Sequence, residues 1–402
     1  MLKSKSEKIF FFLALLGVYL LTTGISFAAF NYFRKPLTKK QEVDAVPTEE
    51  GFLIDVSGPK TETCPLNGKL FTEAEREAWL EKRPLLVMIE NHEEARPQSG
   101  LSETDIVYET VAEGGITRFM AVFYCDAVAK ETIMGPVRSA RTYFLDWASE
   151  YGDYPLYAHV GGAHCDPQTG EGCLNGAKAD ALGQIVDYGW EGENDLNQFS
   201  IGYPTFWRDY ERIGHTVATE HTMYSTTEKL WAVAKQRGWT NKGPEGEDWQ
   251  TDFVSWSFKD DASEAERKDN QKIEFAFWEN HENYKVKWSY FKEANEYQRA
   301  NGGSDHLDLN TNQPLTAKNV VIQFAQESAA NDGYPDNVHL LYGTIGEGKA
   351  LVFQNGQAIS AKWIKTSRRA RTKFFNQDGE EISFVRGRIW LEVVPTGTKI
   401  SY

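Results

Sequence analysis

The sequence predicts an α+β fold, in which an N-terminal mixed α/β domain is followed by a β-rich C-terminal domain. Three observations support this prediction. Over residues 71–248, apolar residues at helical spacing alternate with short apolar runs of strand length. Residues 249–271 form a charged linker region. From 272 to 402, strand-length runs recur about every ten residues with little helix between them.

Local signals place the elements of the N-terminal domain. Thr72 and Glu75 have the spacing of a capping box, which predicts a helix over residues 72–81. Residues 84–90 are an apolar run of strand length. Two further strands, 105–112 and 116–124, flank a turn at Gly-Gly. A further strand is expected to end within residues 135–141, and a helix follows it to about residue 151, with Ser139 as its N-cap. The remaining expected elements are a strand at 154–160 and helices at 177–188 and 226–237.

The turn at residues 114–115 sets a register for its hairpin. The opposed pairs are then Glu113 with Ile116, Val111 with Arg118, and Glu109 with Met120. In this register Glu109, Glu113 and Arg118 share one face of the hairpin. A slip of one residue in the turn separates them.

In the C-terminal domain, Asn355-Gly356 and Asp378-Gly379 are strong two-residue turn signals. The expected strands are 273–278, 284–290, 319–325, 339–343, 349–354, 357–364, 372–376, 381–385 and 388–394.

The first 35 residues predict a membrane-targeting segment. Residues 9–30 carry no charge, and as a helix at about 1.5 Å per residue they span roughly 33 Å, enough to cross a bilayer. Three lysines precede them, which favours a cytoplasmic N-terminus. The alternative is a signal peptide cleaved after Ser26-Phe27-Ala28. Residues 36–70 follow as a linker. The body is thus expected outside the cytoplasm, either attached to the cell membrane by a single pass or secreted.

Export makes the four cysteines candidates for disulfides. Cys165 and Cys173 flank a short glycine-containing loop, and Cys64 and Cys125 would then remain to pair. Four cysteines allow three pairings, and the sequence does not select one. Residues 1–63 contain no cysteine, which excludes a lipid-modified one there. No spacing typical of a zinc site occurs, so neither a metal nor a cofactor is expected.

The charge balance limits the classes of partner. The chain has 43 Lys and Arg against 58 Asp and Glu, a net charge of −15 at pH 7. An acidic excess of this size repels phosphate backbones, so a general nucleic-acid-binding role is excluded. No phosphate-binding loop and no nucleophile elbow of a serine hydrolase is present.

The segment Arg138-Ser139-Ala140-Arg141 is the main candidate for ligand binding. It places two guanidinium groups at a predicted helix start, where the helix dipole disfavours cations. This placement is favourable if an anion lies beside them. That anion is either a ligand carboxylate or phosphate, or a side chain of the protein itself: Glu90, Glu109 or Glu113.

Other polar residues are expected at strand ends, where mixed α/β folds often bind ligands. His159 with Glu90 or Glu109 is a candidate acid–base pair. The candidates for ligand binding are Arg96, Glu113, Arg118, Arg138, Ser139, Arg141, Gly161 and Gly162.

Several motifs resemble the YerB-like family of bacterial envelope lipoproteins, whose domain has no assigned function. They include RPLLVMIENH, ARPQSGLSETDIVYETVAEGGITRFMAVF, GPVRSARTYFLDWASEY and, further on, HLDLNTNQPLTAKNVVIQFA and GEGKALVFQNGQAISAKWIK. The resemblance covers roughly residues 80–400, and residues 96–101 and 135–141 are its most specific parts. It implies an extracytoplasmic, membrane-attached protein with two such domains, and no established activity. This chain departs from the family in lacking a lipidation cysteine.

Three functions remain open at this point. The first is an envelope binding module whose Arg138 and Arg141 hold an anionic group of a wall polymer or partner. The second is a hydrolase or transferase that acts on an envelope glycan or peptide through His159 and a glutamate. The third is a scaffold for a membrane partner. The expected membrane contact runs through residues 9–30.

Overall fold

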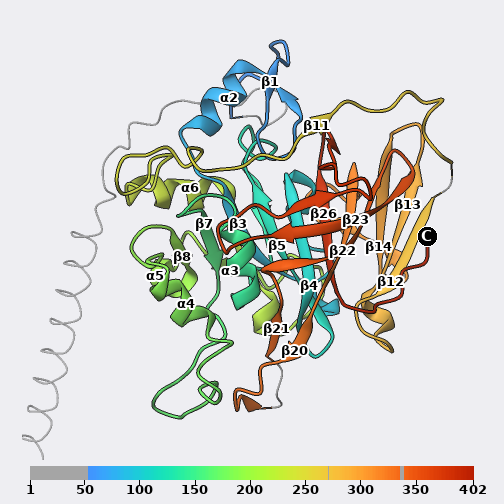
Figure 1. Ribbon diagram of the computed structural model, residues 1–402. Coiled ribbons are helices and arrows are strands. Elements are labelled where there is room, and N and C mark those ends of the chain that lie inside the picture. Colours follow the sequence, from blue (N-terminus) through green and yellow to red (C-terminus); the bar gives the residue numbers. More distant parts are fainter. Residues whose placement is uncertain (1–52, 270, 336–338) are drawn as a thin grey trace, which may run out of the picture. The chain divides into compact units, whose positions relative to one another are not determined.

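The computed structural model describes residues 53–269, 271–335 and 339–402 (Figure 1). The expected membrane segment at 9–30 and residues 36–52 of the expected linker lie outside these residues. Within the described ranges, no helix is both long and apolar enough to cross a membrane.

A ten-stranded mixed sheet forms the centre of the fold, and both predicted domains contribute strands to it. The halves meet where β26 pairs in parallel with β4. In sheet order the strands are β24 (Lys373–Phe375), β23 (Gln357–Lys365), β22 (Gly346–Gln354), β19 (Asn319–Ala325), β26 (Ile389–Pro395), β4 (Ile106–Glu113), β5 (Ile116–Phe123), β3 (Leu85–Glu90), β7 (Leu156–His159) and β8 (Asp195–Asn197).

The strand pairings bring several strand ends to one edge of this sheet. β3 is parallel to β7, β7 to β8, β4 to β26 and β26 to β19, while β5 runs antiparallel to both β3 and β4. Strands β3, β4, β7, β8, β19 and β26 therefore all point the same way. Residues that end β3, β4, β7 and β8 lie along the same edge, and this edge carries the candidate site.

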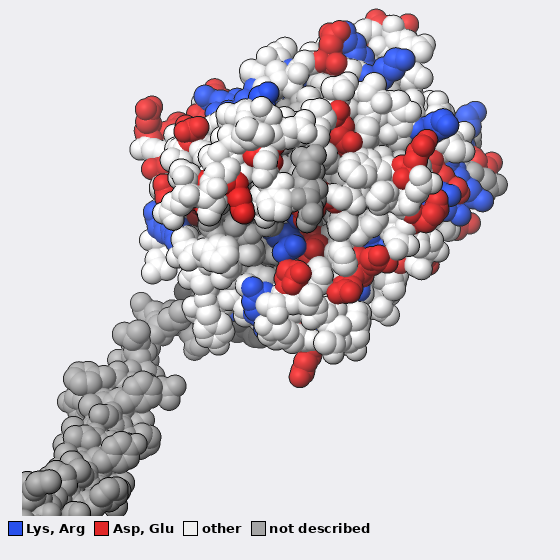
Figure 2. All heavy atoms as spheres, turned by 90° about the horizontal axis from the view of Figure 1, so that it is seen from below, with Lys and Arg blue, Asp and Glu red and all other residues white. Residues whose placement is uncertain are grey.

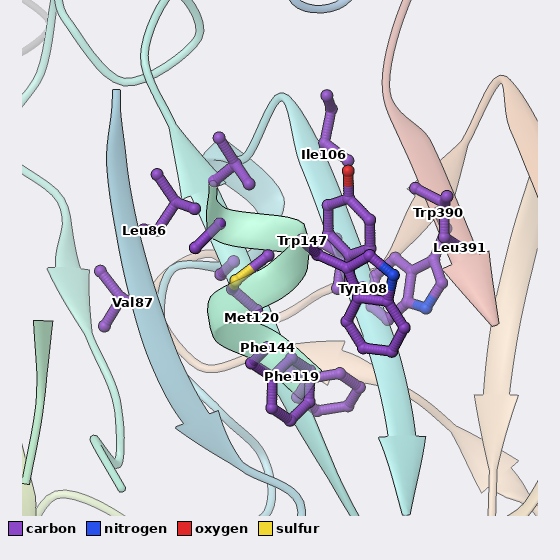
Figure 3. Packing of buried hydrophobic residues seen from close by; sticks show 14 of the residues in the cluster. Leu86, Val87, Ile106, Tyr108, Phe119, Met120, Phe144, Trp147, Trp390 and Leu391 are labelled. Atoms are coloured by element: carbon purple, nitrogen blue, oxygen red, sulfur yellow. The ribbon is translucent and has the colours of Figure 1, made fainter. Parts of the chain in front are cut away.

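Both faces of the central sheet are covered, which explains why β3 is buried at all six positions. On one face, helix α3 (Thr142–Ala148) packs its Trp147 against Tyr108 of β4, with ring centroids 5.7 Å apart (Figure 3). On the other face, Trp390 of β26 contacts Phe119 of β5 and Trp288.

Trp288 belongs to a second sheet of five strands, which follows the alternating burial expected for a sheet with one solvated face. Its strands are β12 (Lys272–Ala276), β13 (Lys285–Phe291), β14 (Glu296–Asn301), β15 (Ser304–Asp305) and β18 (Thr316–Ala317). Because Trp288 packs on Trp390, the core is continuous between the two sheets.

The remaining elements are short. The other α-helices are α2 (Glu73–Leu80), α4 (Ala181–Asp187), α5 (Gln198–Ile201) and α6 (Thr227–Gln236). The 3₁₀ helices are Glu93–Ala95, Leu101–Glu103, Thr219–His221 and Glu282–Tyr284. The minor paired strands are β1 (Glu62–Thr63) with β2 (Leu70–Phe71), β10 (Met223–Thr226) with β6 (Ile133–Met134) and β9 (Trp207–Arg208), β11 (Phe258–Lys259) with β25 (Phe384–Val385), β16 (Leu307–Asp308) with β17 (Gln313–Pro314), and β20 (Glu327–Ala329) with β21 (Leu340–Tyr342).

The register predicted for the β4–β5 hairpin is wrong beyond the turn. Glu113 does face Ile116, but an irregularity between Val111 and Glu113 shifts the ladder, so that Glu109 faces Phe119 and Thr110 faces Arg118. Because side chains alternate between the two faces of a strand, Glu109 and Arg118 lie on opposite sides of the sheet.

The predicted helix start at Ser139 is also wrong. Helix α3 begins at Thr142, and its N-cap is Arg141, which makes no side-chain capping bond. The preceding residues do not continue the helix, because the backbone amides of Val137, Arg138 and Ala140 donate to carbonyls of distant segments: Met223, Met88 and Gly161.

Two disulfides join Cys64 with Cys125 and Cys165 with Cys173. This is the pairing in which the short loop closes on itself. The first links the segment before β2 to the end of β5, and its two sulfur atoms lie in the core.

Candidate functional site

The segment around Arg138 lies between the ends of two parallel strands. β3 and β7 pair only as far as Val87 and Ala158. Beyond that point the amide of Arg138 donates to the carbonyl of Met88 at 2.8 Å, and the carbonyl of Arg138 accepts from Val160 at 3.0 Å. The strands thus separate around this segment at their carboxyl ends, which is where open α/β sheets bind ligands.

Three guanidinium groups and two carboxylates gather there, and we call these five side chains the arginine cluster: Glu90, Glu113, Arg118, Arg138 and Arg141. Glu113 pairs with Arg118 at 3.0 Å and also with Arg141. Glu90 pairs with Nε of Arg138 at 3.2 Å. The contacting groups therefore hold three positive charges against two negative ones.

The charges in the arginine cluster stabilise one another. Burial by itself raises the pKa of Glu113, but the nearby Arg118 and Arg141 outweigh burial and hold this pKa well below its usual value. Burial lowers the pKa of Arg118, yet Glu113 and Glu90 more than compensate and the net shift is upward. Glu113 is consequently ionised and Arg118 charged at neutral pH.

Arg138 is the least satisfied member of the cluster. Its side chain is 24% exposed, against 2% for Arg118 and 9% for Arg141. Within the described part of the chain, its only ionic partner is Glu90, through Nε, and its Nη1 and Nη2 have no hydrogen-bond acceptor. Arg141, in contrast, also donates to the carbonyl of Ala140, and Arg118 to that of Ser139.

Glu90 also connects the arginine cluster to two histidines. Its second oxygen accepts from Nδ1 of His221 at 2.8 Å. This hydrogen bond raises the pKa of His221. The ring of His221 stacks on that of His92, with centroids 4.6 Å apart and planes 12° from parallel.

His159 is fully buried and held on both sides of its ring. Nδ1 lies 2.6 Å from the carbonyl of Gly161, and Nε2 lies 2.7 Å from Asp195. The histidine thus bonds to Asp195 rather than to Glu90 or Glu109, the partners considered in the sequence analysis. Gly161 adopts a φ of +60°, and a Cβ on Gly162 would lie 2.8 Å from Leu182. Both glycines are needed for the local chain path.

Arg96 binds the protein itself. Its guanidinium donates to the side chain and carbonyl of Asn91 and to the carbonyl of Asn283, and it stacks over Tyr284 at 4.9 Å. Burial lowers the pKa of Arg96 to about 10. This side chain fixes the loop after β3 to the second sheet.

Glu109 lies on the opposite face of the sheet, in a fully buried polar network. One oxygen pairs with Arg299 of β14 at 2.5 Å, and the other accepts from Asn91 and Thr117. Arg299 also lies 3.5 Å from Glu392 of β26 and donates to Nδ1 of His306 at 2.6 Å. With no exposed atom, Glu109 stabilises the join between the sheets.

His306 in this network is expected to make stability depend on pH. Burial and the nearby Arg299 and Arg96 lower its pKa well below 6.5, so the folded state keeps it neutral. The unfolded chain takes up a proton below about pH 6.5, so the free energy of unfolding falls by up to about 1.4 kcal/mol per pH unit as pH decreases. Urea denaturation between about pH 7 and pH 5 checks this, and His306→Gln is expected to show the shallower decline. Equal declines in the two proteins would contradict the assignment.

Comparison with known proteins identifies the family. Residues 71–240 match the N-terminal domain, and residues 273–391 the C-terminal domain, of a family described as protein of unknown function (DUF3048). Together the two matches cover more than half of the chain. The chain belongs to the DUF3048 family. The YerB-like resemblance is therefore confirmed.

One curated DUF3048-type relative is "Putative lipoprotein YerB" of Bacillus subtilis (strain 168), 29% identical over 361 residues. The match covers 89% of this chain and 91% of the relative. The crystal structure of the YerB protein from Bacillus subtilis has a TM-score of 0.63 to this chain at 27% identity. It covers 85% of this chain and 100% of the solved one.

Sequence reasoning missed two groups of residues in this DUF3048 member. His221 was not singled out, although it contacts both Glu90 and His92. Arg299 and Glu392 were not connected with Glu109. In both cases the partners come from distant segments, so no local spacing indicates them. Only the position of Glu90 at the end of an apolar strand pointed to this region.

Proposed function

We propose that this DUF3048 protein is a cell-envelope binding module that holds an anionic group of a wall polymer, a carboxylate or a phosphate, at Arg138. The supporting observation is that Nη1 and Nη2 of this partly exposed guanidinium have no acceptor within the described residues. A guanidinium fork binds planar oxyanions through paired, charge-assisted hydrogen bonds. A ligand oxyanion would also balance the excess positive charge of the arginine cluster.

The surface favours one discrete anionic group over an extended polyanion. On the face drawn in Figure 2, basic side chains are interspersed with acidic ones and form no broad basic region. The overall charge of −15 also opposes non-specific attraction of polyanions. Recognition would therefore depend on local geometry at Arg138.

A place outside the cytoplasm fits this function. Two disulfides are typical of proteins in oxidising compartments. The Bacillus relative is named as a lipoprotein, and residues 9–30 of this chain carry no charge. We propose attachment to the cell membrane through that segment, with the described body on the outer side, or secretion if the segment is cleaved.

The alternative, an acid–base hydrolase or transferase, has less support. It requires a histidine that exchanges protons with a substrate, whereas His159 is buried and bonded through both ring nitrogens. Glu109 is equally enclosed. Binding needs only the exposed donors of Arg138.

Calorimetry with purified wall fragments tests the binding function. One titration uses carboxylate-bearing peptide fragments and the other a phosphate-bearing polymer, so that the source of the anion is distinguished. Arg138→Gln is expected to weaken binding at least about tenfold in one of the two titrations, since a charge-assisted hydrogen bond contributes about 1.5–3 kcal/mol.

A matched variant controls for general loss of charge. Arg76→Gln removes another partly exposed arginine. Arg76 lies on helix α2 and pairs with Glu62 of β1. The variant is expected to bind as the wild type does. Equal affinity of wild type and Arg138→Gln for every fragment that binds, or no binding of either fragment class, would refute the proposed site.

A further inference from the structure

We propose that His92, Glu94 and His221 form a binding site for a divalent transition-metal ion, with Zn²⁺ the best chemical match. One ligand atom from each of these residues lies within 4.8 Å of the other two. This inference stands on the geometry of the three side chains and does not depend on anion binding at Arg138.

The donor set matches the coordination chemistry of zinc. Two imidazoles and one carboxylate are the protein ligands of a common type of open zinc site, in which a fourth position is left for water or another ligand. Ligand atoms around a tetrahedral Zn²⁺ lie about 3.4 Å apart. Nε2 of His221 and the nearer oxygen of Glu94 are already 3.6 Å apart.

His221 is oriented as a metal ligand. Its Nδ1 is 2.8 Å from the buried carboxylate of Glu90, which leaves Nε2 directed toward Glu94. A carboxylate on the far nitrogen is the usual outer partner of a metal-bound histidine, because it fixes the ring and makes the coordinating nitrogen more basic. Glu90 is itself held by Arg138 at 3.2 Å.

His92 and Glu94 come from one short turn that is fixed in place. They lie at the start of the 3₁₀ helix Glu93–Ala95, directly after β3. Arg96 ties this turn to Asn91 and Asn283 through three hydrogen bonds. A rigid backbone under the ligands lowers the entropic cost of binding a metal ion.

Completing the site requires one imidazole to turn out of the stack, because a metal ion lies in the plane of each ring that binds it and the two rings are 12° from parallel. The ring of His92 is held only by a long bond of 3.2 Å, which its Nδ1 accepts from the amide of Glu94, and by the stacking on His221. The side chain of Glu94 is 55% exposed and is free to rotate toward the two rings.

A second group with metal-ligand chemistry supports no such proposal. Cys64, Asp105 and Cys125 also lie close together, but the two sulfurs are joined to each other. They therefore offer no thiolate for a metal ion.

Isothermal titration calorimetry of the purified full chain with ZnCl₂ tests the proposal. We expect one Zn²⁺ per chain. His92→Gln, Glu94→Gln and His221→Gln are each expected to weaken binding at least tenfold. Glu94 is exposed, so its variant is expected to fold normally even if replacement of the buried His221 perturbs the protein. Loading with Co²⁺ is expected to give the visible absorption of a tetrahedral nitrogen–oxygen site, and His92→Gln is expected to lose it.

His215→Gln provides the control, because this exposed histidine is not part of the cluster. It is expected to bind Zn²⁺ as the wild type does. The proposal is overturned if wild type takes up no stoichiometric Zn²⁺, or if Glu94→Gln and His92→Gln bind it unchanged. Neither outcome changes what the titrations of Arg138→Gln with wall fragments show. The zinc proposal can therefore be refuted without refuting the anion-binding proposal, and the reverse also holds.

Discussion

Arg299→Met is expected to lower the free energy of unfolding by about 3–5 kcal/mol. Arg299 lies in a fully buried network, where it pairs with Glu109 at 2.5 Å and lies 3.5 Å from Glu392. Methionine leaves the carboxylate of Glu109 in the core without its counter-ion, and an uncompensated buried charge is strongly destabilising. Chemical denaturation followed by circular dichroism measures the difference.

Glu392→Gln is the matched control, and its expected effect is within about 1 kcal/mol of zero. Burial and the nearby Glu109 raise the pKa of Glu392 well above its usual value, which favours the neutral form of this side chain. A neutral amide of the same shape still accepts from Trp288, whose indole nitrogen lies 2.9 Å from Glu392. If Glu392→Gln lowers the free energy of unfolding as much as Arg299→Met does, the assignment of a neutral Glu392 beside a charged Glu109 is wrong.

Replacing both Cys64 and Cys125 with alanine is expected to cost roughly 4 kcal/mol of stability, because the bond closes a loop of 61 residues in the unfolded chain. Loop-closure entropy grows with loop length, so the same change at Cys165 and Cys173, which are 8 residues apart, is expected to cost only about 2.5 kcal/mol.

Urea denaturation of the two double variants, each compared with wild type, checks this ranking. Adding a reductant to wild type is expected to lower the free energy of unfolding by at most the sum of the losses measured for the two double variants. A larger loss from the short loop than from the long one would show that strain or local packing, rather than loop closure, determines the contribution of these bonds.

Sequence patterns predicted those elements whose cause is local. The helix at 72–81 appears as Glu73–Leu80, with both bonds of the capping box between Thr72 and Glu75. The strand at 319–325 appears with the expected bounds, because five of its seven residues are apolar and three of those are β-branched. The turn at 114–115 joins β4 and β5 as expected.

Elements that depend on distant contacts were predicted less well. Strand β14, Glu296–Asn301, is polar at four of its six positions and has no local strand signal, yet β13 pairs with it over its whole length. The expected strand at 381–385 reduces to Phe384–Val385, which pairs with β11. The bulge after Val111 depends on how β4 packs and is not encoded by its turn.

The candidate site shows the same division. Arg138, Arg141 and Glu113 were selected from the sequence, and they do lie together. Glu113 ends β4, and the backbone of Arg138 bonds to residues at the carboxyl ends of β3 and β7. From the sequence, the anion beside the arginines is either a ligand or one of the protein's own glutamates, and the structure places Glu90 and Glu113 there. His221 required the fold to bring it beside Glu90.

The order of strands in the central sheet has a consequence for biosynthesis. Strand β26, which is the last strand of that sheet along the chain, is inserted between β4 and β19. Until Ile389–Pro395 take their place, β4 and β19 each keep an open edge whose amide and carbonyl groups can pair with other chains. The two parts of the central sheet therefore join only after β26 has been made, and a fragment that ends just before β26 would expose both edges to aggregation.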